Sequence, residues 1–125
     1  MDDCEFDVEN FVDENGNCPM NEFIEELRKN GSYNEINKIN HFIKLLKKFG
    51  YRLPGINEEQ ASLVENGLYE LRPFPNRVLY FYSNDNKKYI LLHAFKKKTN
   101  KTPPEEKVRA FNEIEIYKRK IKNEK

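Results

Sequence analysis

Residues 68–96, LYELRPFPNRVLYFYSNDNKKYILLHAFK, consist of three apolar runs joined by two short turn sequences. Runs rich in aromatic and β-branched residues, bounded by Pro, Asn and Asp, predict strands at residues 68–72, 77–83 and 88–96. The links PFPN and NDNK are too short for a crossover, so the three strands should form an antiparallel meander. The second and third runs are apolar on both faces, which predicts that other elements cover both sides of the sheet.

Two amphipathic helices are predicted upstream of this meander. The first begins near Pro19 and ends at Gly31, and the second opens with the capping-box pair Ser32 and Glu35 and closes at Gly50. Both have apolar residues at helical spacing, so they should form a hairpin with one shared buried face. These residues are Met20, Phe23, Ile24 and Leu27 in the first helix, and Ile36, Ile39, Phe42, Ile43, Leu46 and Phe49 in the second.

The remaining segments complete a β-α-α-β-β-β-α order. Residues 5–12 predict a first strand, and residues 51–66 predict a loop with a short helical turn. Thr102 and Glu105 form a second capping box, with Pro103 at the first position of a last helix. The apolar face of that helix consists of Val108, Phe111, Ile114, Tyr117 and Ile121. We therefore expect an α+β fold, in which a small antiparallel sheet carries the helical hairpin and a C-terminal helix, as one domain over residues 1–125.

The composition excludes several classes of protein. No apolar run approaches the roughly 20 residues that a membrane-spanning helix requires. The acidic start of the chain, MDDCEFDVEN, lacks the basic and apolar regions of a signal peptide. We therefore expect a cytoplasmic protein in which Cys4 and Cys18 are free thiols. The sequence has no metal-ligand spacing, phosphate-binding loop or dinucleotide motif, so it predicts neither a metal nor a cofactor.

The net charge of +1 hides a strong polarity along the chain. Residues 1–27 carry ten acidic residues and no basic ones, whereas residues 86–125 carry 13 Lys or Arg against five Glu. This asymmetry suggests a polyanionic partner for the basic half, such as a nucleic acid. An ordinary solvated, charged C-terminal helix is the alternative reading.

Strand parity brings several charged residues together. Glu70 and Arg72 share one face of their strand, and Arg77 opens the next strand across a short turn. Lys96, Lys97 and Lys98 end the strand that should pair with the middle one, so cations from three strands should gather at one part of the sheet. Arginine offers a planar fork for phosphate, and lysine a compact point charge. Alternatively, Arg72 pairs with a nearby carboxylate and the lysines are solvated.

The two histidines carry weaker signals. His41 lies beside the apolar stripe of the second helix, where a surface or boundary position is expected. His93 stands in the third strand, two residues before Phe95 and on the same face, which makes it a candidate general base or acid. A structural role is the alternative for His93.

Two longer stretches, FDVENFVDENGNCPMNEFIEELRKNG and GLYELRPFPNRVLYFYSNDNKKYILLHAFKKKTNKTPPEE, carry a family resemblance. They resemble the HigB branch of the RelE/ParE toxin superfamily, a branch often described as phage-derived. The specific features are LYELR, RVLYF and HAFKKKTNKTPPEE in that order, and the resemblance covers roughly residues 5–120. The predicted order of elements agrees with the fold of that family.

The resemblance implies a type II toxin that a cognate antitoxin holds inactive, for HigB usually a small helix-turn-helix protein of the HigA type. The free toxin would enter the ribosomal A site and cleave mRNA without a metal ion. In such a reaction the 2′-hydroxyl attacks the neighbouring phosphate, cations stabilise the extra negative charge, and other groups move the protons.

The resemblance also implies roles for individual residues. Arg77 matches the arginine that RelE-type nucleases place on the scissile phosphate, and Lys97 falls where RelE has an arginine after its last long strand. Lys96 and Arg72 match neighbouring basic positions. The RelE lysine pair is absent, because Leu68 and Glu70 stand there instead.

The departure from RelE leaves the general base open. Glu70 is a possible base or the ion-pair partner of Arg72, and His93 is a second candidate. Lys98 and Lys101 are expected to hold the RNA backbone. Two other readings of the whole chain remain: a ParE-like inhibitor of DNA gyrase on the same fold, and a catalytically degenerate relative that only binds an antitoxin or RNA. The clustered cations favour the nuclease, because a gyrase inhibitor does not need convergent phosphate ligands.

Overall fold

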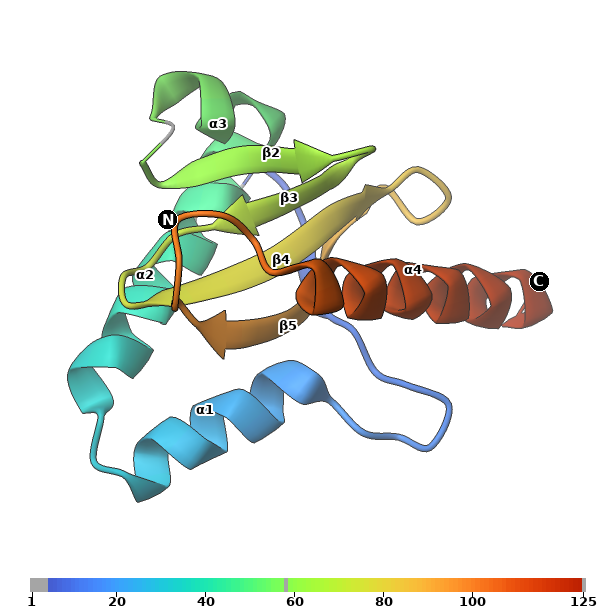
Figure 1. Cartoon of the computed structure of the whole chain (residues 1–125). Helices are drawn as coiled ribbons and strands as arrows, with labels where there is room; N and C mark the ends of the chain where they lie inside the picture. The colour runs from blue at the N-terminus through green and yellow to red at the C-terminus, as the bar shows by residue number, and fades with distance from the viewer. Residues whose placement is uncertain (1–4, 58, 125) are drawn as a thin grey trace.

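A computed structural model describes residues 5–57 and 59–124, which form a five-stranded sheet with helices on both faces (Figure 1). The strand order across the sheet is β1-β5-β4-β3-β2. The strands are β1 (Val8–Asn10), β2 (Ala61–Glu65), β3 (Leu68–Leu71), β4 (Asn76–Ser83) and β5 (Lys88–Lys96). The helices are α1 (Pro19–Lys29), α2 (Tyr33–Phe49), a short 3-10 helix η1 (Gly50–Arg52), α3 (Leu53–Ile56) and α4 (Pro104–Glu124).

The antiparallel meander is confirmed, and the sheet is larger than predicted. Strands β3, β4 and β5 pair antiparallel, with Glu70 opposite Leu79 and Arg77 opposite Phe95. The expectation of a loop over residues 51–66 was wrong in part, because residues 61–65 form β2 and extend the meander at its edge. The first strand is shorter than predicted and runs parallel to β5 at the other edge.

Both faces of the sheet are covered, as the apolar strands predicted. On one face, buried residues of α1 and α2 such as Leu27, Ile39 and Leu46 pack against Val78 and Leu91. On the opposite face, α4 lies across the sheet, as Figure 1 shows in red. Its buried residues pack against the other side of the same strands, and this second cluster includes Leu79, Phe81, Ile90, Leu92, Ala110, Ile114, Tyr117 and Ile121.

A β-bulge in the β4–β5 pairing decides which way His93 faces. Leu79 lies opposite His93, but the next residue of β4, Tyr80, lies opposite Leu91, so β5 has one extra residue, Leu92. Because of this extra residue, Leu92 packs in the cluster under α4 and His93 contacts α4 as well. In a regular strand, neighbouring side chains would point to opposite faces.

The helix ends follow the sequence signals with small differences. Helix α1 starts at Pro19, and Gly31 just beyond its end has a positive φ of 73°, a conformation that glycine adopts without strain. Ser32 stands at the N-cap of α2, but its side chain makes no capping hydrogen bond and interacts with the Glu35 carboxylate instead. Helix α4 begins at Pro104, one residue later than predicted.

The structure also bears on the predictions for the cysteines, for His41 and for membrane-spanning helices. Cys18 is a free, half-buried thiol, whereas Cys4 lies outside the described residues. His41 is exposed on α2, as expected. None of the helices in residues 5–57 and 59–124 is both long and apolar enough to cross a membrane.

Candidate functional site

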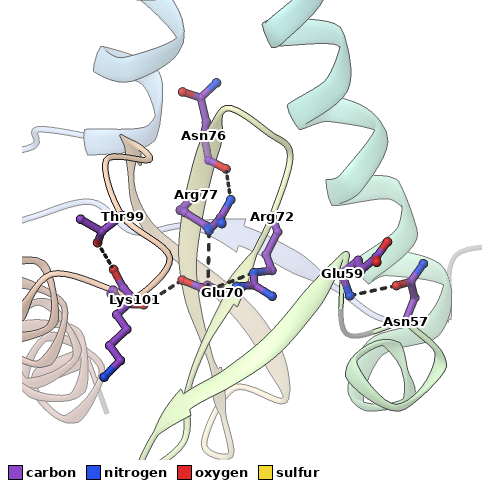
Figure 2. Close-up of polar contacts among 9 residues, drawn as sticks. Asn57, Glu59, Glu70, Arg72, Asn76, Arg77, Thr99 and Lys101 are labelled. Atoms are coloured by element: carbon purple, nitrogen blue, oxygen red, sulfur yellow. Dashed lines mark hydrogen bonds and ion pairs between the residues drawn. The ribbon is translucent and has the colours of Figure 1, made fainter.

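Two arginines converge on one carboxylate at the start of the meander (Figure 2). The Arg72 Nε atom lies 3.3 Å, and the Arg77 Nε atom 3.7 Å, from Oε1 of Glu70. The second oxygen of Glu70 accepts a hydrogen bond of 2.9 Å from the Thr102 hydroxyl. We call Glu70, Arg72, Arg77 and Thr102 the arginine cluster. It forms because Glu70 and Arg77 point to the α4 face of the sheet, just where the chain enters α4.

The members of the arginine cluster differ in their exposure to solvent. The side chains of Glu70 and Arg77 are only 5% and 8% exposed, whereas that of Arg72 is 27% exposed. Burial lowers the pKa of the Arg77 guanidinium from its ordinary value, and the Glu70 carboxylate opposes this change. The Arg77 NH1 atom also donates to the carbonyl of Asn76 at 3.3 Å. Arg77 is therefore an inner residue, and Arg72 is the arginine that solvent can reach.

A groove of about 420 Å³ opens beside the arginine cluster. Its lining includes Glu70, Arg72 and Thr102, together with Lys101 and Lys107. Glu70 is the one carboxylate among the lining residues in the described part of the chain. The groove lies between strand β2 and the start of α4, whose Lys107 Nζ atom lies 2.9 Å from a carboxylate oxygen of Glu65. The site is therefore an open groove with cations on its walls and one buried carboxylate.

The lysines after β5 do not act as one group. Lys97 lies against the β3–β4 turn, with its Nζ atom 5.7 Å from the ring centroid of Phe74. The Lys97 backbone N–H donates to the carbonyl of Pro75 at 2.7 Å, which ties the end of β5 to that turn. Lys98 and Lys101 are exposed in the segment that leads to α4.

Lys96 points to the opposite face of the sheet from the arginine cluster. Its Nζ atom lies 3.2 Å from Oε1 of Glu35 on α2, and the same oxygen accepts a 2.9 Å hydrogen bond from the buried Asn76 amide. The Asn76 hydrogen bond and Lys96 hold the pKa of the Glu35 carboxyl below its usual value, although partial burial acts in the other direction. Lys96 thus joins the sheet to the helical hairpin, while Lys97 lies against the β3–β4 turn.

His93 is fully enclosed under α4. Its Nδ1 atom lies 2.6 Å from Oε1 of Glu113, and its Nε2 atom lies 2.9 Å from Oε1 of Glu106. Both ring nitrogens therefore face carboxylates, and the second Glu113 oxygen accepts from Arg109 at 3.3 Å. With 1% of its surface exposed, His93 fastens α4 to the sheet and has no nitrogen left for a substrate.

The sequence predicts that Glu70, Arg72 and Arg77 lie together, which the structure confirms, but other contacts of the cluster are not predictable from it. The shared face of Glu70 and Arg72 follows from strand parity, and the Glu70–Arg72 pair that was weighed as an alternative is present. The local pattern predicts a capping box for Thr102, yet its hydroxyl donates to Glu70. Phe74 belongs to the predicted turn, and its side chain is 61% exposed beside Lys97. An aromatic residue between two arginines, as in RPFPNR, is the available signal for a nucleic-acid contact.

The arrangement suits an anion that carries several oxygens. Two guanidinium groups already share one carboxylate oxygen, and guanidinium groups bind carboxylate and phosphate with similar geometry. Lys101, which lines the groove, and the exposed Lys98, three residues before it in the chain, could extend such binding along a polyanion. Chemically, the groove offers cations to stabilise negative charge and one carboxylate that could accept a proton.

Comparisons with known proteins show the family to which this chain belongs. Residues 22–115 match the family described as Phage derived protein Gp49-like (DUF891). No curated protein matches the chain. The fold is similar to that in a crystal structure of the archaeal RelE–RelB complex from Pyrococcus horikoshii OT3, with a TM-score of 0.50 and 17% sequence identity over 73% of this chain and 93% of that chain. At that identity, the likeness confirms a RelE-like α+β fold. Because the family match covers most of its length, the chain belongs to the phage-derived Gp49-like family.

Proposed function

We propose that this chain is the toxin of a type II toxin–antitoxin system, and that it is a HigB-like endoribonuclease that cleaves mRNA on the ribosome. The observation that carries the proposal is the convergence of Arg72 and Arg77 on a single oxygen of Glu70 at the edge of a cationic groove. The RelE-like fold and the Gp49-like family support it.

The first step of the proposed reaction is an exchange of anions at Arg72. In the free chain, Glu70 is the counter-ion of both arginines. Arg72 lines the groove and is partly exposed, so an entering phosphate can replace Glu70 as its ligand. Two phosphate oxygens can bind the guanidinium fork side by side, and this geometry is stronger than an ion pair through Nε. Lys101 lines the same groove and would hold the neighbouring part of the RNA backbone.

The second step is the attack of the 2′-hydroxyl. The O2′–P bond forms as the P–O5′ bond breaks, which leaves a 2′,3′-cyclic phosphate and a 5′-hydroxyl. Glu70, released from Arg72, takes the proton of the 2′-hydroxyl, while a second group on the toxin or the ribosome gives a proton to the departing 5′-oxygen. Arg72 and Lys97 stabilise the extra negative charge on phosphorus.

Arg77 and His93 act through other residues in this proposal. Arg77 is buried behind Glu70 and contacts its Oε1 atom, so it sets the position of the base. His93 is held by Glu106 and Glu113 and fixes α4, which carries one wall of the groove. The resemblance assigned Arg77 to the scissile phosphate, and its burial favours the positioning role instead.

An antitoxin and the ribosome are the proposed partners. The solved structure with a similar fold is a RelE–RelB complex, which supports a protein partner for this chain as well. We propose a helix-turn-helix antitoxin of the HigA type, encoded beside this chain. Substrate positioning in the ribosomal A site, within the cytoplasm, would supply much of the rate by holding the 2′-hydroxyl in line with the P–O5′ bond.

Cell-free translation with the purified protein tests the proposal. New mRNA 5′ ends are mapped with and without ribosomes, for the wild type and for Arg72→Ala and Glu70→Gln. We expect ribosome-dependent cuts within codons and losses on the order of 10²-fold for Arg72→Ala and 10²-fold or more for Glu70→Gln. The matched controls are Arg119→Ala and Glu115→Gln on the exposed side of α4, which should cleave like the wild type.

The outcomes separate the parts of the proposal. If Glu70→Gln cleaves mRNA like the wild type, Glu70 is a counter-ion and not the general base. If Arg72→Ala cleaves like the wild type, the proposed exchange of Glu70 for phosphate at Arg72 is refuted. If mRNA stays whole with every protein, the nuclease is excluded. A DNA gyrase supercoiling assay then tests the ParE-like function on the same fold.

A further inference from the structure

A second groove lies along a different side of α4 from the proposed catalytic groove. It has a volume of about 500 Å³ and is formed by α4, the start of α1 and the connection from β1 to α1, which Figure 1 draws in blue. The connection and α1 contribute Asp13 and Glu22 to its lining, and α4 contributes Glu105, Val108 and Arg109. We call it the acidic groove.

Different positions of α4 line the two grooves. Pro104 and Lys107 line the proposed catalytic groove, whereas Glu105, Arg109 and Asn112 line the acidic groove. With 3.6 residues per turn, these two sets of side chains leave the helix in different directions. The inference below therefore does not depend on the proposed function.

The acidic groove has an apolar base, and one of its apolar side chains is uncovered. Phe11 is buried there and Ile116 is half-buried. Val108 is the first residue of the apolar stripe of α4, where the sequence predicts a buried position, yet its side chain is 61% exposed. Covering such a side chain removes apolar surface from water and so favours binding. An apolar side chain of a partner would therefore be stabilised against Val108.

The lining of the acidic groove carries more negative than positive charge. Among the described residues it includes four carboxylates, those of Asp13, Glu22, Glu105 and Glu113, and one cation, Arg109, which gives a formal net charge of −3. The Arg109 Nε atom already lies 3.3 Å from Oε2 of Glu113. The one cation of the lining is therefore engaged with the one buried carboxylate, and the other three carboxylates keep their charge.

These three carboxylates are accessible and ionised. The backbone N–H of Asn17 donates to Asp13 at 2.9 Å, and this hydrogen bond lowers the pKa of the Asp13 carboxyl. Glu22 and Glu105 are exposed, and within residues 5–57 and 59–124 neither of them forms an ion pair, because the pairs of α1 and α4 involve other carboxylates. New cations could therefore bind at Glu22 and Glu105 without displacing a partner.

The remaining cations of α4 lie toward its C-terminal end. Arg119 and Lys120 line a neighbouring cavity together with Ile116, and Lys120 is the weakest of the influences on the Asp13 pKa. From Glu105 to Ile116 the helix rises about 16 Å. The acidic groove is therefore least negative near Ile116, and the carboxylates along the rest of it would repel a nucleic acid.

We propose that the acidic groove is a docking site for a basic segment of a partner protein, which places an apolar side chain on Val108 and lysine or arginine side chains against Glu22 and Glu105. The net charge of the lining selects for cations, and the uncovered Val108 selects for an apolar anchor. Six residues in extended conformation span about 20 Å, so a short segment is long enough to follow α4 over the length of the groove.

An NMR titration of the full chain tests this site with three capped peptides. The first is Ser-Lys-Leu-Lys-Arg-Ser, the second has glutamine in place of its three basic residues, and the third has serine in place of leucine. We expect saturable backbone amide shifts in α4 and in residues 11–22 with the first peptide. Binding should be weaker by about fivefold or more for the uncharged peptide, and by about threefold or more for the peptide without leucine.

Variants separate the acidic groove from a general attraction between opposite charges. The double variant Glu22→Gln with Glu105→Gln should weaken binding of the basic peptide about threefold or more. The matched control is Glu26→Gln with Glu115→Gln, which makes the same charge change at exposed positions of the same two helices outside the groove and should bind like the wild type.

Val108 is tested in the same way. Val108→Ser removes the apolar contact at an exposed position, so it should weaken binding of the basic peptide about threefold or more without affecting the fold. Val108→Leu keeps an apolar side chain and should bind like the wild type.

Four results would overturn the proposal. Equal binding of the basic and uncharged peptides would exclude selection for charge, and equal weakening by the two double variants would show attraction by the overall charge alone. An unchanged affinity of Val108→Ser would exclude the apolar anchor. If sedimentation velocity shows a dimer of the free chain that Val108→Ser dissociates, the occupant of the groove is a second copy of the chain.

Discussion

Replacing Glu70 by glutamine should destabilise the fold, because it leaves the Arg77 cation buried without its anion. The side chains of Glu70 and Arg77 are 5% and 8% exposed, so water cannot take over the role of the carboxylate. Removing one partner of a buried ion pair typically costs about 3–5 kcal/mol. The Nε–Oε1 distance of 3.7 Å is long, which places the expected loss near the lower end, at about 3 kcal/mol.

Other contacts of Glu70 should change less in this variant. Glutamine keeps a side-chain oxygen that can accept from the Thr102 hydroxyl. Arg72 is 27% exposed, so solvent can partly replace its lost partner. A loss of about 3 kcal/mol is a large share of the 5–15 kcal/mol that stabilises a typical domain, so the variant should fold but unfold at a clearly lower urea concentration.

Urea unfolding followed by circular dichroism measures this loss, and a double variant identifies its cause. Glu70→Gln combined with Arg77→Met removes both charges and keeps an unbranched apolar side chain. It should recover more than half of the lost free energy, because the buried Arg77 cation is gone and only the partly exposed Arg72 has lost its carboxylate. A loss below about 1 kcal/mol for Glu70→Gln, the size expected of an exposed pair, would refute the reasoning.

Three further perturbations test other parts of the structure. The Glu35 pKa is lowered mainly by the Asn76 hydrogen bond, so Glu35 stabilises the fold above its ordinary pKa and this contribution is lost as pH falls below about 4.5. Urea midpoints should therefore fall less steeply from about pH 6 to pH 3 in Glu35→Gln than in the wild type. Burial raises the Tyr89 pKa from 10.0 to about 12, so its stabilising effect is present below pH 10 and is lost as pH rises toward 12. In Tyr89→Phe, the urea midpoint should therefore fall less than in the wild type as pH rises from about 10 to 12. His93→Leu leaves the buried Glu113 without its 2.6 Å partner and should cost about 1–3 kcal/mol, with faster amide hydrogen exchange in α4 than in β4.

The sheet was predictable where its residues carry strong local signals. The strands β3, β4 and β5 are apolar, adjacent and separated by turn residues, so their antiparallel order follows from the sequence. Strand β2 was missed because its segment, ASLVE, is short and mixed, and only pairing with β3 makes it a strand. The parallel pairing of β1 with β5 joins distant parts of the chain, which no local pattern can show.

Of the candidate site, the sequence predicts only the residues that the alternation of side chains along a strand places on one face. Parity places Glu70 and Arg72 on one face, and the short turn brings Arg77 beside them. Parity also separates Lys96 from Lys97, although the run of lysines reads as one patch in the sequence. The enclosure of His93 depends on the bulge and on two carboxylates of α4, which are tertiary features. The Thr102 hydroxyl binds Glu70 instead of capping α4, whereas the local sequence pattern predicts the cap.

The arginine cluster also has a consequence for the order in which the chain is made. Glu70, Arg72 and Arg77 are synthesised before Thr102, whose hydroxyl holds the second Glu70 oxygen, and before α4, which covers this face. The first strand, β1, can pair only after β5, which follows it by about 80 residues, has been made. Contacts between such distant segments form slowly, and a growing chain cannot form them before the later segment has left the ribosome. A nascent chain that ends before Thr102 and α4 therefore cannot assemble the groove, so the proposed activity would begin only after these segments have left the ribosome.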